Sequence, residues 1–261
     1  RSMPMLKLAD KSKAEPIKEF CGNTLLGTYI TCRMSCYGFG FDFLSFWLSE
    51  NDGKVDCVVG SMDNCAVVLA SGNTDYEELK QFIDVLGFSN VMMSEQTAEK
   101  CGFENYELKN SFVYSDKSVE SFEACDGADM KKVYELISAS IPDSFENSNF
   151  AYLNFLSDYT FRERRNAARL KVLKDDDTVL SCALTSAETD RAAIISGVAC
   201  SKKMRGKGLG KMTVLSLANE LSDENKTVYV VALNKSAEDF YGKIGFTSYE
   251  TVAEIERNNN V

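Results

Sequence analysis

The sequence predicts an α/β protein (mixed α+β) built from two similar domains, and three observations support this prediction. Its 261 residues are 44% apolar and 26% charged, which is ordinary for a globular chain of one or two domains. Each half is expected to contain three consecutive strands, a helix, a strand, a helix and a final strand. A Gly-Phe pair precedes that final strand in both halves, as Gly102-Phe103 and Gly245-Phe246. The alternative is one α/β module with an unrelated β-rich extension.

The first domain is assigned to residues 1–118, in which residues 1–20 form a short helix or an extended lead-in. Its strands are predicted from β-branched and aromatic runs separated by turn residues, Asn51-Asp52-Gly53 among them. These strands are Phe41–Ser49, Val55–Ser61, Ala66–Ala70, Asn90–Met93 and Tyr106–Tyr114. Apolar residues at helical spacing between Thr74 and Gly87 predict one helix. A second helix is expected around Gln96–Lys100.

The second domain is assigned to residues 119–261 and is predicted from the same signals. Its helices are Asp129–Ser140, Phe150–Phe161, Lys211–Leu221 and Ser236–Ile244. Its strands are Ala168–Lys174, Val179–Ala187, Ala192–Cys200, Thr227–Leu233 and a last one from Phe246.

Charge and the absence of histidine restrict the chemistry. The chain has 29 basic and 39 acidic residues and a net charge of −10, which argues against nucleic acid or an anionic membrane as a partner. Without histidine it can form no Ser-His-Asp triad and no imidazole metal site, and no metal is expected. Its nine cysteines are scattered, most of them among apolar residues, as in a reducing compartment. Its apolar runs are too short to span a bilayer, so we expect a cytoplasmic protein.

A glycine-rich segment, Arg205-Gly206-Lys207-Gly208-Leu209-Gly210, lies between a predicted strand and a predicted helix. Glycines let the backbone turn tightly, and the first N–H groups of a helix are unpaired and favour negative charge. Together with Arg205 and Lys207, this pattern is typical of a phosphate or pyrophosphate cradle. The spacing matches neither a Walker loop nor a Rossmann fingerprint. The alternative is a glycine turn that binds no ligand.

Two polar residues follow this segment. Asn234 ends the predicted strand, and Tyr241 stands two helical turns later, so both can lie on one face of the following helix. Phe240 and Ile244 are expected to point more toward the core. Taken alone, Tyr241 fits a core aromatic residue with an exposed hydroxyl at least as well as it fits a functional residue.

Together these features resemble the GNAT superfamily of acyl-CoA N-acyltransferases. The resemblance rests on a strand, Arg205-x-x-Gly208-x-Gly210, a helix, a strand, Asn234 and Phe240-Tyr241-Gly242-Lys243-Ile244-Gly245-Phe246. It extends over about Asp129–Glu250 and is specific from Ile194 to Phe246. It implies two GNAT-like domains, each a mostly antiparallel mixed sheet flanked by helices. In the C-terminal half the sheet is expected to be splayed, between the strands that end at Cys200 and Leu233, to hold acyl-CoA.

The resemblance also implies the residues of the site. The pantetheine arm of acetyl-CoA is expected to pair with the backbone of Val198, Ala199 and Cys200, and Asn234 is expected to contact it. The pyrophosphate is expected on backbone N–H groups of Arg205, Gly206, Lys207, Gly208, Leu209, Gly210 and Lys211. Tyr241 is expected to be the general acid that protonates the departing thiolate, because a phenol stays protonated at neutral pH.

The general base is left open. Many relatives use a glutamate on the strand that here reads Ile194-Ile195-Ser196-Gly197-Val198, and this strand has no carboxylate. The alternatives are Glu188, Asp190, Glu146 or a chain of water molecules. A basic cluster of Arg162, Arg164, Arg165 and Arg169 is expected to be a solvated face, the alternative being a contact with the 3′-phosphate of the cofactor or an acidic partner.

The first half lacks this machinery. Its segment Ser71-Gly72-Asn73-Thr74 has one glycine and no basic residue, and Ala98 takes the place of Tyr241. We expect a degenerate domain that does not bind acyl-CoA and that shapes the acceptor site or forms an interface.

The whole chain is therefore expected to be an acetyl-CoA-dependent N-acetyltransferase. It would act on a primary amine of a small molecule or peptide by direct transfer in a ternary complex. The alternatives are a catalytically silent acyl-CoA-binding or regulatory protein and a nucleotide-phosphate binder. The acceptor and the oligomeric state, a homodimer included, are left open.

Overall fold

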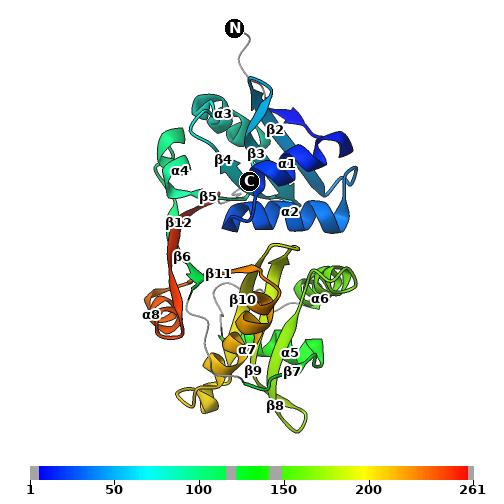
Figure 1. Cartoon of the computed structure of the whole chain (residues 1–261), viewed down its shortest axis with the longest axis vertical. Coiled ribbons are helices and arrows are strands. Elements are labelled where there is room, and N and C mark those ends of the chain that lie inside the picture. Colours follow the sequence, from blue (N-terminus) through cyan, green and yellow to red (C-terminus); the bar gives the residue numbers. More distant parts are fainter. Residues whose placement is uncertain (1–5, 116–121, 141–148, 258–261) are drawn as a thin grey trace. The chain divides into compact units, whose positions relative to one another are not determined.

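The computed structural model describes residues 6–115, 122–140 and 149–257, and the chain forms two compact units (Figure 1). The first unit consists of Arg1–Ser111, Ala232–Asn234 and Tyr249–Val261, and the second of Phe112–Val231 and Lys235–Ser248. The predicted division into residues 1–118 and 119–261 has one boundary. In the structure each unit instead combines segments from separate parts of the chain. No helix within the described ranges combines the length and the apolar composition that a membrane span requires.

The structure contains every strand and helix predicted between Phe41 and Tyr114, with shifts of a few residues at their ends, and all but the last residues of β6 lie in the first unit. They are β2 (Leu44–Asn51), β3 (Lys54–Met62), β4 (Cys65–Ala70), α3 (Tyr76–Leu86), β5 (Asn90–Ser94), α4 (Glu95–Cys101) and β6 (Glu107–Tyr114). They are preceded by β1 (Lys7–Leu8), a 3-10 turn (Lys11–Lys13), α1 (Ala14–Cys21) and α2 (Leu25–Tyr37).

Helix α2 was not predicted. Thr24 caps it by accepting a hydrogen bond from the Gly27 N–H at 3.2 Å, which is an ordinary helix start. Most of its residues are buried, including Thr28 and Thr31 as well as its aliphatic residues. A helix that is buried on most sides shows no alternation of apolar and polar faces, so its sequence lacks the periodic signal.

The sheet of the first unit has helices on both faces. Val59 of β3 belongs to one apolar cluster with Leu79 and Ile83 of α3. The next residue, Gly60, faces the other side, where an added Cβ would lie 3.3 Å from Ile30 of α2. Because successive side chains of a strand alternate between faces, α2 and α3 cover opposite faces of the sheet.

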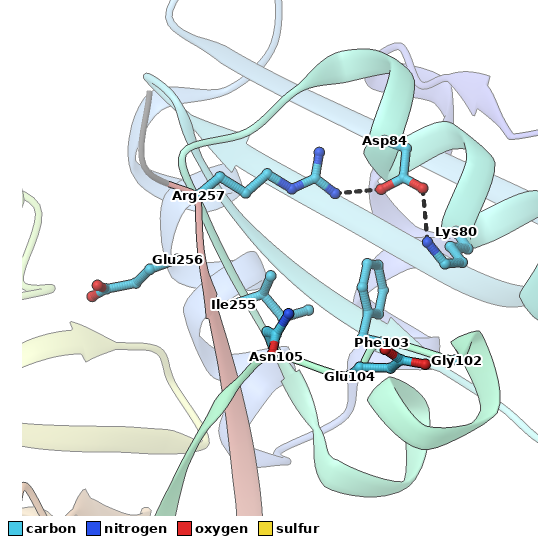
Figure 2. Close-up of a pocket in the computed structure, with 9 residues that line it drawn as sticks. All are labelled: Lys80, Asp84, Gly102, Phe103, Glu104, Asn105, Ile255, Glu256 and Arg257. Carbon is cyan, nitrogen blue, oxygen red and sulfur yellow. Dashed lines mark hydrogen bonds and ion pairs between the residues drawn. The ribbon is translucent and has the colours of Figure 1, made fainter. Parts of the chain in front are cut away.

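The last strand of the chain, β12 (Phe246–Glu256), completes the sheet of the first unit. The strand order there is β1-β2-β3-β4-β5-β12-β6, and Val252–Glu256 pairs antiparallel with Asn90–Ser94 of β5 (Figure 1). The Arg257 N–H donates to the Ser89 carbonyl at 2.9 Å. Figure 2 shows Asp84 of α3 bound by both Arg257 and Lys80, in a pocket of about 490 Å³.

The second unit repeats the element order of the first. Its helices are α5 (Met130–Ser140), α6 (Asn149–Glu163), α7 (Leu209–Asp223) and α8 (Lys235–Lys243), with a 3-10 turn at Lys202–Met204. Its strands are β7 (Cys125–Asp126), β8 (Leu170–Asp175), β9 (Thr178–Glu188), β10 (Ala192–Cys200) and β11 (Thr227–Val231), in the order β11-β10-β9-β8-β7. In both units two helices are followed by three antiparallel strands, a helix, a parallel strand and a helix. This shared order confirms the predicted pair of similar domains.

A network of ion pairs joins β8, β9, α7 and β11 of the second unit. The fully buried side chain of Glu188 accepts from Arg169 at 2.8 Å and from Lys226 at 2.6 Å. Arg169 also binds Glu220 at 2.8 Å and Glu224 at 2.6 Å. A buried charge of this kind is stable only while its partners remain.

The predicted basic cluster is therefore divided in the structure. Arg169 belongs to the ion-pair network, and Arg162 is buried and donates to the carbonyl oxygens of Ala167 at 3.2 Å and Thr185 at 3.1 Å. Only Arg164 and Arg165 are exposed. The expectation of a solvated face is wrong for Arg162 and Arg169, because their guanidinium groups satisfy buried acceptors.

The pairing of β12 with β5 leads to a first prediction. Ile255 is 4% exposed and packs in the apolar cluster of the first unit, whereas its neighbour Glu256 is exposed. Ile255→Ala should lower the free energy of unfolding by about 2–4 kcal/mol and speed amide hydrogen exchange in β5. Glu256→Ala is the matched control, with a change below about 0.5 kcal/mol. Equal exchange in β5 for both variants would contradict the pairing.

The ion-pair network leads to a second prediction. The hydrogen bond from Arg169 lowers the pKa of Glu224 to about 2. A carboxyl group with a lowered pKa stabilises the folded state above its unfolded pKa of about 4.3 and loses this effect as the pH falls toward its folded pKa. The stability difference between the wild type and Glu224→Gln should therefore shrink between pH 6 and pH 3, as measured by urea unfolding. A difference that stays constant with pH would contradict this account.

Candidate functional site

The candidate site begins where β10 parts from β11. The parallel pairing of these strands runs from Ala192 opposite Thr227 to Ile195 opposite Val230. Beyond Ile195, β10 continues to Cys200, whereas β11 ends at Val231. Pairing of the two strands therefore ends where the splay of the sheet was predicted, and the backbone of Val198, Ala199 and Cys200 lies beyond the last residue of β10 that pairs with β11.

A β-bulge at Gly197 shapes this part of β10. Its φ is +54°, and the register with β9 shifts between Ser196 and Ala199. A Cβ at Gly197 would lie 3.0 Å from Leu184 and 3.1 Å from Ile137, so only glycine fits both the space and the backbone conformation. Gly197 was not assigned a role from the sequence. A glycine inside a predicted strand was the signal that could have identified it.

The glycine-rich segment forms an open loop between β10 and α7. Gly206 and Gly208 adopt the left-handed conformation, with φ of +78° and +83°. A Cβ at either glycine would meet nothing within 4 Å, so the turn needs glycine for its backbone angles and not for space. The Arg205 Nε donates to the Cys200 carbonyl at 3.4 Å, which ties the loop to the end of β10.

The N-terminus of α7 is open to an anion. Gly208 is the N-cap residue and supplies no side-chain acceptor, and the first turn contains no acidic residue. The N–H groups of Leu209 and Gly210 precede the first intrahelical hydrogen bond, which the Met212 N–H donates to the Gly208 carbonyl at 3.0 Å. The missing side-chain cap, the helix dipole and the positive charge of Lys211 all favour negative charge at this point.

The corresponding positions in the first unit can be identified from the strand register. The Ser201 N–H donates to the Leu180 carbonyl, and the Ser71 N–H donates to the Asp56 carbonyl, both at 2.8 Å. Ser71 therefore corresponds to Ser201, and Asp56 corresponds to Leu180. The loop after Ser71 is shorter, because α3 starts at Tyr76 whereas α7 starts only at Leu209.

In the first unit this loop is closed by its own side chains. Asp75 caps α3 by accepting from the Glu78 N–H at 3.0 Å, and Glu77 and Glu78 lie in the first turn. The Thr74 hydroxyl donates to the Asp56 carbonyl at 2.7 Å. The first unit thus has acidic residues where the second has glycines and a lysine.

Asp56, whose carbonyl binds this loop, also has a buried side chain. Asp56 is 3% exposed and accepts a hydrogen bond from the Ser49 hydroxyl. Its second oxygen has no hydrogen-bond partner among the described residues.

Helix α8 places Tyr241 near the loop of the second unit. A Cβ at Gly210 would lie 3.8 Å from the ring of Phe240, so α8 packs beside the start of α7. Tyr241 is 7% exposed, and its ring centroid lies 5.2 Å from that of Phe240 and 5.6 Å from that of Phe246. The expectation that Phe240 points more toward the core than Tyr241 is wrong, because Tyr241 is the buried residue and Phe240 is only half-buried.

Burial also affects the acidity of Tyr241. Removal of its hydroxyl from water raises the pKa of this phenol well above its usual value, so the group stays protonated throughout the neutral range. Asn234 lies in the turn directly before α8, with an exposed side chain. The structure brings together β10, the glycine loop, α7 and α8, and the role of Asn234 stays a prediction.

Two of the candidate bases can be placed. Glu188 lies opposite Ala193, at the end of β10 that is still paired with β11, and its carboxylate is bound by Arg169 and Lys226. It could accept a proton only by losing these ion pairs, so its role is structural. Asp190 is exposed in the turn before β10, at the same end. Glu146 lies outside the described residues.

Comparisons with known proteins agree with this geometry. The family model described as FR47-like protein matches residues 177–255, which include β10, the glycine loop, α7 and Tyr241. No curated protein matches the chain.

Among solved structures, a GNAT-family acetyltransferase from Colwellia psychrerythraea is 12% identical, with a TM-score of 0.61 over 96% of this chain and 98% of that one. A GCN5-related N-acetyltransferase from Sphaerobacter thermophilus is 12% identical, with a TM-score of 0.61 over 98% of this chain and 96% of that one. A tandem GNAT protein from the clavulanic acid biosynthesis pathway is 12% identical, with a TM-score of 0.60 over 96% of this chain and 98% of that one.

At this identity the solved structures establish the fold, while the family model adds a sequence match in the second unit. The GNAT resemblance is thus confirmed: the chain has the GNAT fold over almost its whole length, in two units of the same element order, and it matches the FR47-like family over residues 177–255.

Proposed function

We propose that the protein is an N-acetyltransferase that moves the acetyl group of acetyl-CoA to a primary amine, by direct transfer in a ternary complex. The observation that carries this proposal is the open start of α7, where Gly208 leaves the first N–H groups without a side-chain cap, together with the end of the pairing between β10 and β11. The GNAT fold and the acetyltransferase titles of the similar structures support the same reaction class.

In this proposal the chain holds the donor through its backbone. The N–H groups from Arg205 to Lys211 bind the pyrophosphate, and the backbone of Val198, Ala199 and Cys200 pairs with the pantetheine arm, with Asn234 as a further contact. Acetyl-CoA supplies a thioester, whose carbonyl carbon an amine can attack. N–H groups of β10 near the Gly197 bulge would stabilise the negative charge that develops on the carbonyl oxygen.

Tyr241 supplies the proton that the departing thiolate needs. Its phenol is protonated at neutral pH, and its contacts with Phe240 and Phe246 hold the ring in place. The proposal assigns no side chain as the base, since β10 has no carboxylate and Glu188 is bound by two cations.

The nine cysteines are all free thiols, which supports a cytoplasmic location.

The same missing base favours a second candidate, a catalytically silent acyl-CoA-binding protein. A panel of primary amines, including small molecules and peptides, separates the two candidates when CoA release is followed with a thiol reagent. Acceptor-dependent release of CoA supports the transferase. Binding of acetyl-CoA without release for any amine supports the silent protein.

The first unit is proposed not to bind acyl-CoA, because its equivalent helix is capped by Asp75 and has Glu77 and Glu78 in the first turn. Calorimetric titration should therefore give one acetyl-CoA per chain.

Gly208→Ala forces an L residue to a φ of +83° and should weaken binding at least about tenfold. Gly72→Ala in the first unit is the control, since its Cβ would meet nothing within 4 Å and its φ is not positive. Two acetyl-CoA per chain, or equal affinity for both variants, would contradict this assignment.

The acid role of Tyr241 gives the next prediction. Tyr241→Phe should lower kcat by about 100-fold while the affinity for acetyl-CoA changes by less than about twofold, because only proton donation is removed. Tyr159→Phe is the control, since Tyr159 is also a buried tyrosine of the second unit, within its apolar core. Unchanged turnover of Tyr241→Phe in a steady-state assay would reject the acid role.

A further inference from the structure

The glycine loop carries more positive charge than a pyrophosphate requires. Between Asp190 and Glu220 the chain contains no acidic residue, although it has 39 in total. Four cations of the loop, Lys202, Lys203, Arg205 and Lys207, are exposed, and none of them forms an ion pair within the described ranges. By contrast, Arg169, Lys171 and Lys226 of the same unit each bind carboxylates.

The side chains of two of these cations contact residues within the loop or directly before it. The Arg205 Nε donates to the Cys200 carbonyl at 3.4 Å, and the Lys207 Nζ lies 3.6 Å from the Met204 sulfur. They stay next to the start of α7, where the pyrophosphate is proposed to bind. Lys202 and Lys203, in the 3-10 turn that follows β10, make no such contact with the described residues and remain available for a further anion.

We propose that Lys202 and Lys203 bind the 3′-phosphate on the ribose of CoA and so select CoA over donors that lack this group. The inference rests on the proposed function. A pyrophosphate diester carries two negative charges, and a phosphate monoester carries about 1.5 to 2 more at neutral pH. The four unpaired cations match this total, and the helix N-terminus adds to it. A phosphopantetheine arm on a carrier protein, or 3′-dephospho-CoA, would leave two lysines unneutralised.

Two of the arginines that were considered from the sequence for a contact with the 3′-phosphate already bind other groups. Arg162 is buried against backbone carbonyls, and Arg169 is held by three glutamates. Because Lys202 and Lys203 are exposed, their interaction with a phosphate should weaken as salt screens it over a Debye length of about 10 Å. Salt dependence therefore separates this contact from the backbone contacts of the pyrophosphate.

The test is calorimetric titration of the full chain with CoA and with 3′-dephospho-CoA, at low and high salt. The wild type should bind CoA about tenfold more tightly than 3′-dephospho-CoA at low salt, as expected for two exposed charge pairs, and the preference should shrink at high salt. Lys202→Gln/Lys203→Gln should bind both ligands equally, with its affinity for 3′-dephospho-CoA retained. Lys131→Gln, on the exposed face of α5, is the matched control and should keep the wild-type preference.

The outcomes distinguish this inference from the proposed function. Equal binding of the two ligands by the wild type, or a preference that survives in the double variant, would overturn the role of the two lysines and leave the donor site intact. If the wild type bound neither ligand, the proposed function would fail and the inference with it. Circular dichroism of the double variant checks that its fold is retained.

Discussion

The candidate site depends on backbone N–H groups at the start of α7 that no side chain caps. Unpaired donors are tolerated where water or a ligand can reach them, and they are costly where the protein buries them. Three local features keep them open: the left-handed Gly208 in place of a capping side chain, the parting of β10 from β11 after Ile195, and the bulge at Gly197. Each feature is a backbone property, which explains why glycines mark the site more clearly than any charged side chain does.

The first unit shows what the same fold does when the chain satisfies those donors internally. At the equivalent position Asp75 accepts from the helix N-terminus, and Thr74 binds the Asp56 carbonyl. With the loop closed in this way, a side chain of the chain itself accepts from an N–H group at the start of α3, and acidic residues give this helix start a negative charge. The two units thus differ in whether a side chain of the chain caps this helix, and not in the order of their elements.

The distribution of charge in the second unit follows the same division. Three of its acidic residues, Glu188, Glu220 and Glu224, bind Arg169 and so link β9 with the end of α7. The segment from Arg191 to Asn219 has no acidic residue, so the loop cations face no competing carboxylate from their own segment. A chain without histidine then relies on backbone donors and a buried phenol for its proposed chemistry, and the source of a base becomes the central mechanistic question.

The sequence by itself determined the order of the elements from Phe41 onward and the position of the glycine loop. Turn residues, apolar spacing and glycines are local signals, and they survive without knowledge of the rest of the molecule. Helix α2 was not predicted, because its residues are buried on most sides and show no periodic pattern. Only the tertiary structure decided that Glu188 is bound by Arg169 and Lys226, that Tyr241 is buried, and that Val252–Glu256 pairs with β5 of the first unit. These features arise from contacts between residues far apart in the chain, and such contacts leave no trace in the local pattern of either partner.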